Sequence, residues 1–232
     1  MAKIKTSIGD IHYTIRPLYL GIKRIDKTIS LENLMLFKSI ADKNGIKFGL
    51  IAGTLLGAVR EKDFISHDED TDLFLYEKDK EYFLSKLPLF LNEGFEIVRY
   101  DRRGLISIMK NGEYIDLYFF TELENNVSNC CGWLIPTTFL KNTGIINFKN
   151  IEFYAPKNYI DYLVYEYGNS WSTPIPYTDF NVAKWKIILF KWKEIIKTYL
   201  PDTLFYLFAN KTEKEIQKTY FNKLDIYFKN NQ

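Results

Sequence analysis

The sequence predicts a mixed α/β (α+β) protein, in which helices flank a twisted mixed sheet and a helical portion follows at the C-terminus. Two observations support this class. Between residues 47 and 154, short apolar runs alternate with turn residues, which is typical of strands. From residue 181 onward, apolar side chains recur at helical spacing instead. We therefore expect one domain over residues 1–180 and a helical extension over 181–232 that packs on it.

The elements of the first half follow from apolar periodicity and from glycine or asparagine stops. Residues 1–29 carry no clear pattern. A glycine after an apolar helical stretch is a common helix end, as at Gly45 and Gly94. The prediction in chain order is a helix over 30–44, a short strand over 47–52, a break at Gly53-Thr54 with a short helix over 55–60, a strand over 71–76 and a helix over 78–92.

The second half continues with strands joined by tight turns. The Asn111-Gly112 pair is a strong signal for a two-residue hairpin. The prediction in chain order is strands over 95–100, 105–110 and 114–121, a hairpin of 145–148 with 151–154, a helix over 156–167 that ends at Gly168, and two or three helices within 181–230.

Composition excludes several classes of protein. A net charge of +2 provides no global field that would attract nucleic acid. Cys130 and Cys131 are adjacent, which disfavours a disulfide between them and favours a reducing compartment. With only two histidines, His12 and His67, a Cys/His zinc site has few ligands to draw on. Because we find neither a signal-peptide core nor a membrane-length apolar run, we expect a cytoplasmic protein.

The segment HDEDTD at residues 67–72 places four carboxylates just before an apolar strand. In an extended chain, alternate side chains share a face, so Asp68, Asp70 and Asp72 point one way and Glu69 points the other. Like charges this close repel, and a divalent cation would cancel that repulsion. Mg²⁺ prefers such oxygen ligands, with Mn²⁺ as the alternative ion. The competing interpretation is a solvated acidic loop.

A further carboxylate, Asp116, lies within the apolar strand EYIDLYFF. A lone acid in such a strand is costly unless it has a partner. If its strand lies near that of Asp70 and Asp72, three carboxylates can share one or two metal ions, and two ions can clamp an in-line phosphoryl displacement. The alternative is a structural acid that pairs with a lysine or arginine.

Upstream, GTLLGAVR at residues 53–60 has the features of a phosphate-binding segment. Gly53 permits a close approach of the backbone, and Thr54 provides a hydroxyl and an N–H at a helix start. Arg60 can neutralise phosphate oxygens, although a salt bridge to the acidic cluster is the alternative. These residues therefore predict a donor-phosphate site ahead of the metal site.

This ordered set resembles the nucleotidyltransferase superfamily related to DNA polymerase β. More narrowly, the stretch GTLLGAVREKDFISHDEDTDLFLY over residues 53–76 resembles the LicD family of phosphocholine transferases, which is related to the fukutin proteins. A weaker similarity lies in YEYGNSWSTPIP at 165–176. The chain departs from the usual family pattern at Asp63, His67, Glu69 and Thr71, and it retains the three alternating aspartates.

The resemblance implies a polymerase β-like catalytic domain over residues 1–180. Asp70 and Asp72 would then bind Mg²⁺ with help from Asp68. Asp116 would complete the metal site and position or deprotonate the attacking hydroxyl, and Gly53, Thr54 and Arg60 would hold the donor phosphates. The implied reaction is transfer of a phospho-alcohol such as phosphocholine from a CDP-alcohol to a sugar hydroxyl of a surface glycan, in lipopolysaccharide or capsule biosynthesis, with release of CMP.

Three other functions stay open at this point. The same metal site would serve nucleotidyl transfer from an NTP, since only the leaving group differs. A glycosyltransferase with a D-x-D metal motif is disfavoured, because too little nucleotide-binding chain precedes Asp70. A non-catalytic nucleotide- or sugar-binding module is the remaining alternative. An EF-hand is excluded, since Leu73 stands where the calcium loop needs glycine.

The segment at residues 182–200 is basic and amphipathic, with five lysines and one glutamate. The favoured interpretation is a helix that packs its apolar stripe on the core and keeps its lysines in water; the stripe is Ile188, Leu189, Trp192, Ile195 and Ile196. The alternative is peripheral contact with an anionic membrane at its inner face, which would suit a lipid-linked glycan acceptor.

Overall fold

The computed structural model describes residues 2–16, 18, 24–174 and 184–230 of the chain. The predicted boundary at 180/181, the start of the basic segment at 182–183 and the last two residues of the 165–176 motif lie outside the described residues.

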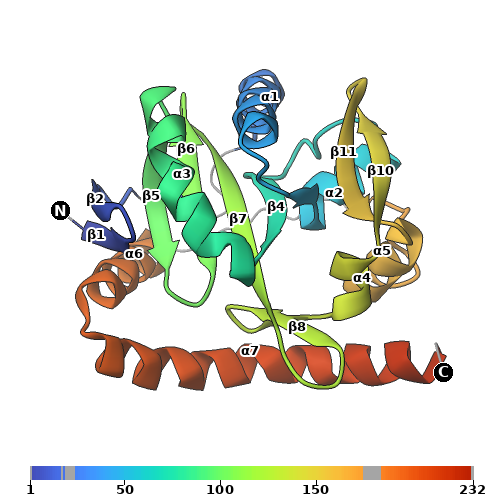
Figure 1. Ribbon diagram of the computed structural model, residues 1–232. Coiled ribbons are helices and arrows are strands. Elements are labelled where there is room, and N and C mark those ends of the chain that lie inside the picture. The colour runs from blue at the N-terminus through green and yellow to red at the C-terminus, as the bar shows by residue number, and fades with distance from the viewer. Residues whose placement is uncertain (1, 17, 19–23, 175–183, 231–232) are drawn as a thin grey trace.

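The described elements alternate between strands and helices up to α5, and helices follow (Figure 1). The first part comprises β1 (Ala2–Thr6), β2 (Gly9–Tyr13), α1 (Lys27–Lys43), β3 (Gly49–Leu50), α2 (Ala52–Arg60), β4 (Thr71–Tyr76), the 3₁₀ turn η1 (Glu77–Asp79), α3 (Lys80–Asn92), β5 (Glu96–Asp101), β6 (Leu105–Lys110) and β7 (Glu113–Glu122). The second part comprises β8 (Val127–Cys130), β9 (Trp133–Pro136), α4 (Thr137–Lys141), β10 (Thr143–Phe148), β11 (Ile151–Pro156), α5 (Tyr159–Tyr167), α6 (Lys184–Tyr199) and α7 (Asp202–Asn230).

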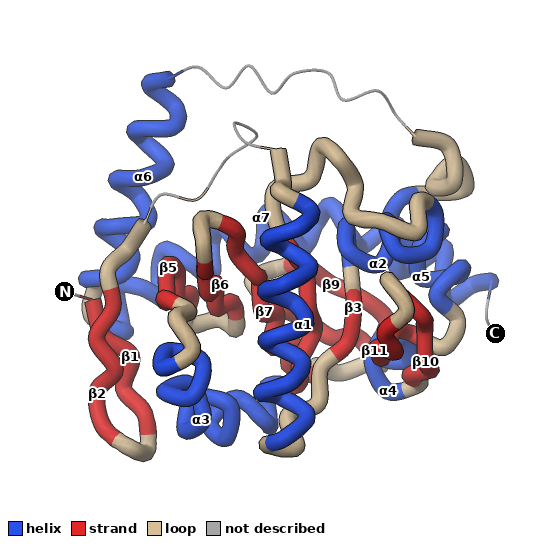
Figure 2. The backbone as a smooth tube through the Cα atoms, turned by 90° about the horizontal axis from the view of Figure 1, so that it is seen from above, coloured by secondary structure: helices blue, strands red, loops and turns tan. Residues whose placement is uncertain are grey.

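Nine of these strands form one mixed sheet, in the order β10-β11-β3-β4-β7-β6-β5, with β8 and β9 added at the end of β7. The pairs β4–β7 and β11–β3 are parallel, whereas β3–β4, β5–β6 and β6–β7 are antiparallel. Helices lie on both sides of this sheet, with α1 and α3 on one face and α2, α5 and α7 on the other (Figure 2). The predicted class, a mixed sheet flanked by helices, is therefore confirmed.

Alternation along the central strands separates an apolar face from a mixed one. Phe119 of β7 contacts Phe83 of α3, so the odd-numbered positions of β7 face α1 and α3. The even-numbered positions face α2, and they include Asp72 on β4 and Asp116 on β7. The fold thus brings two carboxylates to the same face of the sheet, beside α2.

Several helices and strands begin or end at residues other than the predicted ones, for reasons of local structure. The first helix begins at Lys27, because Asp26 caps it by accepting bonds from the backbone N–H groups of Thr28 and Ile29, at 3.0 and 3.1 Å. The predicted strand over 47–52 is reduced to two residues, and Gly53-Thr54 is no break, since α2 already begins at Ala52. The hairpins β1–β2 and β8–β9 were not predicted.

The favoured prediction for the basic segment is wrong. Ile188, Leu189, Trp192 and Ile196 of α6 are 47–57% exposed, so they do not pack on the core. The helix is rotated so that another side faces the domain, and that side includes Ile195, the one member of the predicted stripe that is partly buried. Among the described helices, none combines the length and apolarity that crossing a membrane requires.

Candidate active site

Three carboxylates gather where the chain enters β4. Asp68 and Asp70 lie in the preceding loop and Asp72 is the second residue of the strand. One oxygen from each of the three lies within 4.8 Å of the others. Asp72 is only 6% exposed, whereas Asp68 and Asp70 are partly exposed. The structure therefore brings together three of the predicted metal ligands, and Glu69 is not part of the group.

The start of α2 is fixed against this cluster by hydrogen bonds. The Thr54 hydroxyl accepts a bond from the backbone N–H of Asp72 at 2.8 Å, and the backbone N–H of Gly53 donates to Asp72 Oδ2 at 3.0 Å. Thr54 is 1% exposed, so its hydroxyl holds the strand in place at a buried position. Of the predicted phosphate contacts, Gly53 and Thr54 thus lie directly beside the carboxylates.

Gly53 is also the point of closest approach between α2 and the acidic loop. A Cβ atom at this position would lie 2.2 Å from Asp68 Oδ2 and 3.3 Å from Asp72 Oδ2. The absence of a side chain is therefore what lets the helix start and the carboxylates come together.

We expect Gly53→Ala to weaken Mg²⁺ binding by at least about tenfold without unfolding the protein. The added methyl group displaces the Asp68 carboxylate, while alanine is favoured over glycine within a helix by roughly 1 kcal/mol. Calorimetric titration with Mg²⁺ and thermal unfolding measure the two effects.

Gly57→Ala is the matched control on the same helix. Its Cβ would lie 2.5 Å from the backbone carbonyl oxygen of Asp63, which cannot swing away as a side chain can. This variant should lose stability, by about 1–3 kcal/mol. Wild-type Mg²⁺ affinity in Gly53→Ala would show that the glycine is not needed for the cluster.

Asp116 lies next to the cluster but is held by other partners. It pairs directly with Asp72 across the parallel strands β4 and β7. Ser107 Oγ donates to its Oδ1 at 2.5 Å, and the Arg99 guanidinium forms an ion pair with its Oδ2. Asp116 is 2% exposed and is not one of the three gathered carboxylates. These contacts match the alternative interpretation, in which Asp116 is a structural acid that pairs with an arginine.

Arg99, Ser107 and Asp116 form a row across β5, β6 and β7, and Asp72 continues the row on β4. The sequence analysis did not identify Arg99 or Ser107. A signal for Ser107 was present, because the predicted Asn111-Gly112 hairpin places Ser107 opposite Asp116. No comparable signal marked Arg99.

Burial and mutual repulsion make these carboxyl groups poor acids. Burial, followed by the charges of Asp72, Asp116 and Asp68, raises the pKa of Asp70 well above its usual range. Burial and the charges of Asp68 and Asp116 do the same to the pKa of Asp72, and burial raises the pKa of Asp68 to about 6. A divalent cation would offset the repulsion between these carboxylates and favour their ionised form. Close oxygen ligands of this kind suit a hard cation such as Mg²⁺.

The raised pKa values predict an unusual pH dependence of stability. A carboxyl whose pKa is higher in the folded state stabilises the fold below its unfolded pKa, near 4, and loses that contribution as pH rises through the folded pKa. Metal-free protein should therefore have a higher Tm at pH 5 than at pH 7.5. Addition of Mg²⁺ should raise Tm at pH 7.5, by several degrees at 100 times its Kd, and much less at pH 5.

Thermal unfolding at both pH values, with EDTA or with MgCl₂, tests this pH dependence. Asp70→Asn provides the control, since it removes one of the repelling charges. In this variant, both the difference in Tm between pH 5 and pH 7.5 and the effect of Mg²⁺ on Tm should be smaller. A Tm that falls from pH 7.5 to pH 5 without metal, or a Mg²⁺ effect that is equal at the two values, would contradict the interpretation.

Arg60 lies at the other end of α2, about 10 Å from Gly53 along the helix axis. Its guanidinium contacts Glu61 Oε1 at 2.7 Å and donates to the carbonyl oxygen of Trp171 at 3.2 Å. It therefore pairs with Glu61 and not with the three gathered carboxylates. Through Trp171, Arg60 connects the site to the 165–176 motif, and α5 with Tyr167 packs beside α2.

The charges of the carboxylate cluster also affect the pKa of Tyr167, at the end of α5. Burial, followed by the charges of Asp72, Glu166 and Asp68, raises the pKa of its hydroxyl. The weaker motif near the end of the domain is thus near the carboxylates in space, although Tyr167 follows Asp72 by 95 positions in the sequence.

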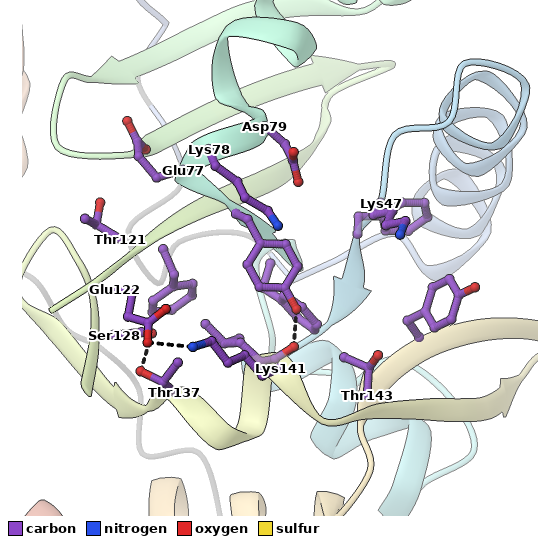
Figure 3. Close-up of a pocket in the computed structure, with 16 residues that line it drawn as sticks. Lys47, Glu77, Lys78, Asp79, Thr121, Glu122, Ser128, Thr137, Lys141 and Thr143 are labelled. Atoms are coloured by element: carbon purple, nitrogen blue, oxygen red, sulfur yellow. Dashed lines mark hydrogen bonds and ion pairs between the residues drawn. The ribbon is translucent and has the colours of Figure 1, made fainter. Parts of the chain in front are cut away.

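A cavity of about 650 Å³ lies elsewhere, at the far ends of β4 and β7 (Figure 3). Tyr76 and Phe120 form part of its wall, and Lys141 pairs with Glu122 at its edge, at 2.6 Å. None of the three gathered carboxylates lines it. The cavity and the three gathered carboxylates therefore lie at opposite ends of β4.

Comparison with known proteins identifies related sequences and similar structures. Residues 45–158, which include α2, β4 and β7, match the family described as LicD/FKTN/FKRP, nucleotidyltransferase domain. An uncharacterized protein of Rickettsia typhi is 25% identical over 195 residues, which cover 82% of this chain and 55% of that protein. The ribitol-5-phosphate transferase FKTN of Mus musculus is 27% identical over 176 residues, which cover 67% of this chain and 37% of that protein. The chain thus spans about half, or less, of the length of these curated relatives.

Two solved structures are similar at low identity. The lincosamide antibiotic adenylyltransferase LnuA, in its lincomycin-bound form, has a TM-score of 0.44 and 12% identity, over 59% of this chain and 85% of that chain. The antibiotic-resistance factor ANT(2'')-Ia has a TM-score of 0.47 and 7% identity, over 88% of this chain and 98% of that chain.

Proposed function

We propose that this chain is a Mg²⁺-dependent phospho-alcohol transferase, because residues 45–158 match the family described as LicD/FKTN/FKRP, nucleotidyltransferase domain. It takes the phospho-alcohol from a CDP-alcohol and transfers it to a sugar hydroxyl of a glycan. The observation that carries this proposal is the convergence of Asp68, Asp70 and Asp72 beside the start of α2. The relative named a ribitol-5-phosphate transferase supports a phospho-alcohol as the transferred group.

In this proposal the sugar oxygen bonds to the distal phosphorus of the donor, and the bond from that phosphorus to the CMP oxygen breaks. Mg²⁺ held by Asp70 and Asp72, with Asp68 beside them, would offset negative charge on the phosphate oxygens. Gly53, which lies beside these carboxylates at the start of α2, is assigned to the donor phosphates. We assign the hydroxyl proton to Asp116, which Arg99 and Ser107 hold in one orientation and which keeps lone pairs available.

Arg60 is assigned to the donor phosphates, as the cation at the far end of α2. To reach them it must exchange its contacts with Glu61 and the Trp171 carbonyl for phosphate oxygens. The acceptor is assigned as a lipid-linked glycan of a lipopolysaccharide or capsule pathway, which would place the enzyme at the inner face of the membrane.

Nucleotidyl transfer from an NTP is the second candidate. The description of the matched domain as a nucleotidyltransferase favours it, and the same carboxylates would serve. The two reactions differ in the leaving group, because the first releases CMP and the second releases pyrophosphate.

Phosphorus NMR distinguishes these reactions. The protein is incubated with Mg²⁺ and, separately, with CDP-choline, CDP-ethanolamine, CDP-glycerol, CDP-ribitol, UDP-glucose and ATP, since a transferase without its acceptor often hydrolyses its donor slowly. We expect CMP from one CDP-alcohol, and no CMP from Asp72→Asn. Pyrophosphate from ATP would support the second candidate. No product from any donor, with or without a panel of glycan acceptors, would contradict both.

A further inference from the structure

Helix α6 carries a continuous stripe of exposed apolar side chains, formed by Ile188, Leu189, Trp192, Ile196 and Tyr199. These residues follow the spacing of one helix face, and they are 47–59% exposed. Soluble proteins seldom leave such a stripe in water along several helical turns. Five residues beyond Tyr199, the first turns of α7 expose three more apolar side chains, Leu204, Leu207 and Phe208.

The opposite side of α6 faces the domain. Ile187, Ile195 and Thr198 line a cavity of about 70 Å³ together with Val98 and Arg99 of β5. Because this side faces the domain, the apolar stripe is directed away from it. In Figure 2 the helix runs along the outer edge of the molecule, apart from the central helices.

The charges on α6 are arranged asymmetrically. The exposed Lys191 and Lys193 flank Trp192 on either border of the stripe. The helix has one acidic residue, Glu194, which faces the domain side and pairs with Lys197 at 3.0 Å. The stripe therefore has cationic borders, and no carboxylate lies among its residues.

We propose that α6 lies on the surface of an anionic phospholipid bilayer, with Ile188, Trp192 and Ile196 inserted among the lipids. Tryptophan and aliphatic side chains are favoured at this depth, and lysines at the border of an apolar face bind acidic headgroups. A second copy of the chain fits less well, because a symmetric contact centred on Trp192 would bring Lys191 and Lys193 of both copies together. This proposal does not depend on the chain being an enzyme.

Membrane contact through α6 would have a consequence for the proposed function. The same helix lines a cavity with Arg99, and Arg99 binds Asp116 beside the three gathered carboxylates. Because a helix with its side chains is about 10–12 Å across, the lipid surface would lie close to this ion pair. A lipid-linked acceptor could then reach the carboxylates without leaving the bilayer.

Co-sedimentation with vesicles tests the proposal. Full-length protein is mixed with vesicles of phosphatidylcholine alone, or with 30% phosphatidylglycerol. Three variants are compared with the wild type. The stripe variant combines Ile188→Glu with Trp192→Glu, and the lysine variant combines Lys191→Gln with Lys193→Gln. Ile226→Glu, at the far end of α7, is the control, because Ile226 is likewise exposed, at 53%. Thermal unfolding and light scattering establish that each variant is folded and report its oligomeric state.

We expect the wild type to bind the anionic vesicles at least tenfold more tightly than the neutral ones. The stripe variant should lose at least tenfold in binding, and the lysine variant should lose roughly 25-fold on anionic vesicles, since each lysine near such a surface contributes about fivefold. Ile226→Glu should bind like the wild type. Absence of wild-type binding, equal binding by a folded stripe variant, or a wild-type dimer that the stripe variant dissociates would each overturn the proposal.

Discussion

Asp70→Asn is expected to lower the kcat of the proposed transfer by at least about 10³-fold. Loss of one group that stabilises charge in a transition state typically costs 10²–10³-fold, and here the substitution also removes a ligand of the cation. Asp70 lies in the centre of the acidic loop, within 4.8 Å of ligand oxygens from both Asp68 and Asp72. The measurement is the rate of CMP release from the donor that phosphorus NMR identifies.

Glu69→Gln is the matched control for this prediction. It removes a neighbouring carboxylate of the same loop that is not part of the cluster. We expect its rate to stay within about threefold of the wild type, since it removes no ligand and no phosphate contact. Equal losses in the two variants would mean that the total charge of the loop matters and the three-carboxylate arrangement does not.

Arg99→Met is expected to destabilise the protein by about 3–5 kcal/mol, because it leaves Asp116 buried without its cationic partner. Ser107 would also lose the bond that it accepts from Arg99 Nε at 2.8 Å. For a domain of this size, the loss corresponds to a decrease in Tm of roughly 10 °C. Chemical denaturation in urea, in the presence of EDTA, measures the change without any effect of metal.

Arg16→Met provides a control for the loss of an arginine from an ion pair, since Arg16 pairs with Glu96 of β5. The Arg16–Glu96 pair is exposed, with side-chain exposures of 51% and 56%, so its loss should cost less than about 1 kcal/mol. The double variant Arg99→Met with Asp116→Asn should recover most of the stability, since no unpaired charge remains. A loss below about 1 kcal/mol in Arg99→Met would show that Asp116 does not depend on this partner.

The central part of the site could be predicted because three aspartates alternate within the five residues that lead into β4. Alternation alone placed Asp68, Asp70 and Asp72 on one side, and the structure gathers their oxygens. The strand over residues 71–76 also lies at the predicted position. Asp116 could be predicted to lie near Asp72, since an acid in an apolar strand needs a polar neighbour.

Other features depend on tertiary contacts that one sequence does not specify. The partner of Asp116 is Arg99, which lies two strands away, and no local pattern identifies it. The β8–β9 hairpin turns at Cys131-Gly132, with φ of 54° and 95°, and cysteine is not a residue that signals such a turn. The side of α6 that faces the domain pairs with β5 through Lys197 and Asp101, a tertiary contact that amphipathicity alone does not specify, so the predicted buried face was wrong.

Calorimetric titration of the metal-free protein with Mn²⁺, at pH 7.5, tests the central claim most directly. The claim is that Asp68, Asp70 and Asp72 together form a divalent cation site. We predict that the wild type and Glu69→Gln bind the ion with similar affinity, and that Asp72→Asn, while still folded, loses at least tenfold in affinity. Undiminished binding by Asp72→Asn, or absence of binding by the wild type, would contradict the claim.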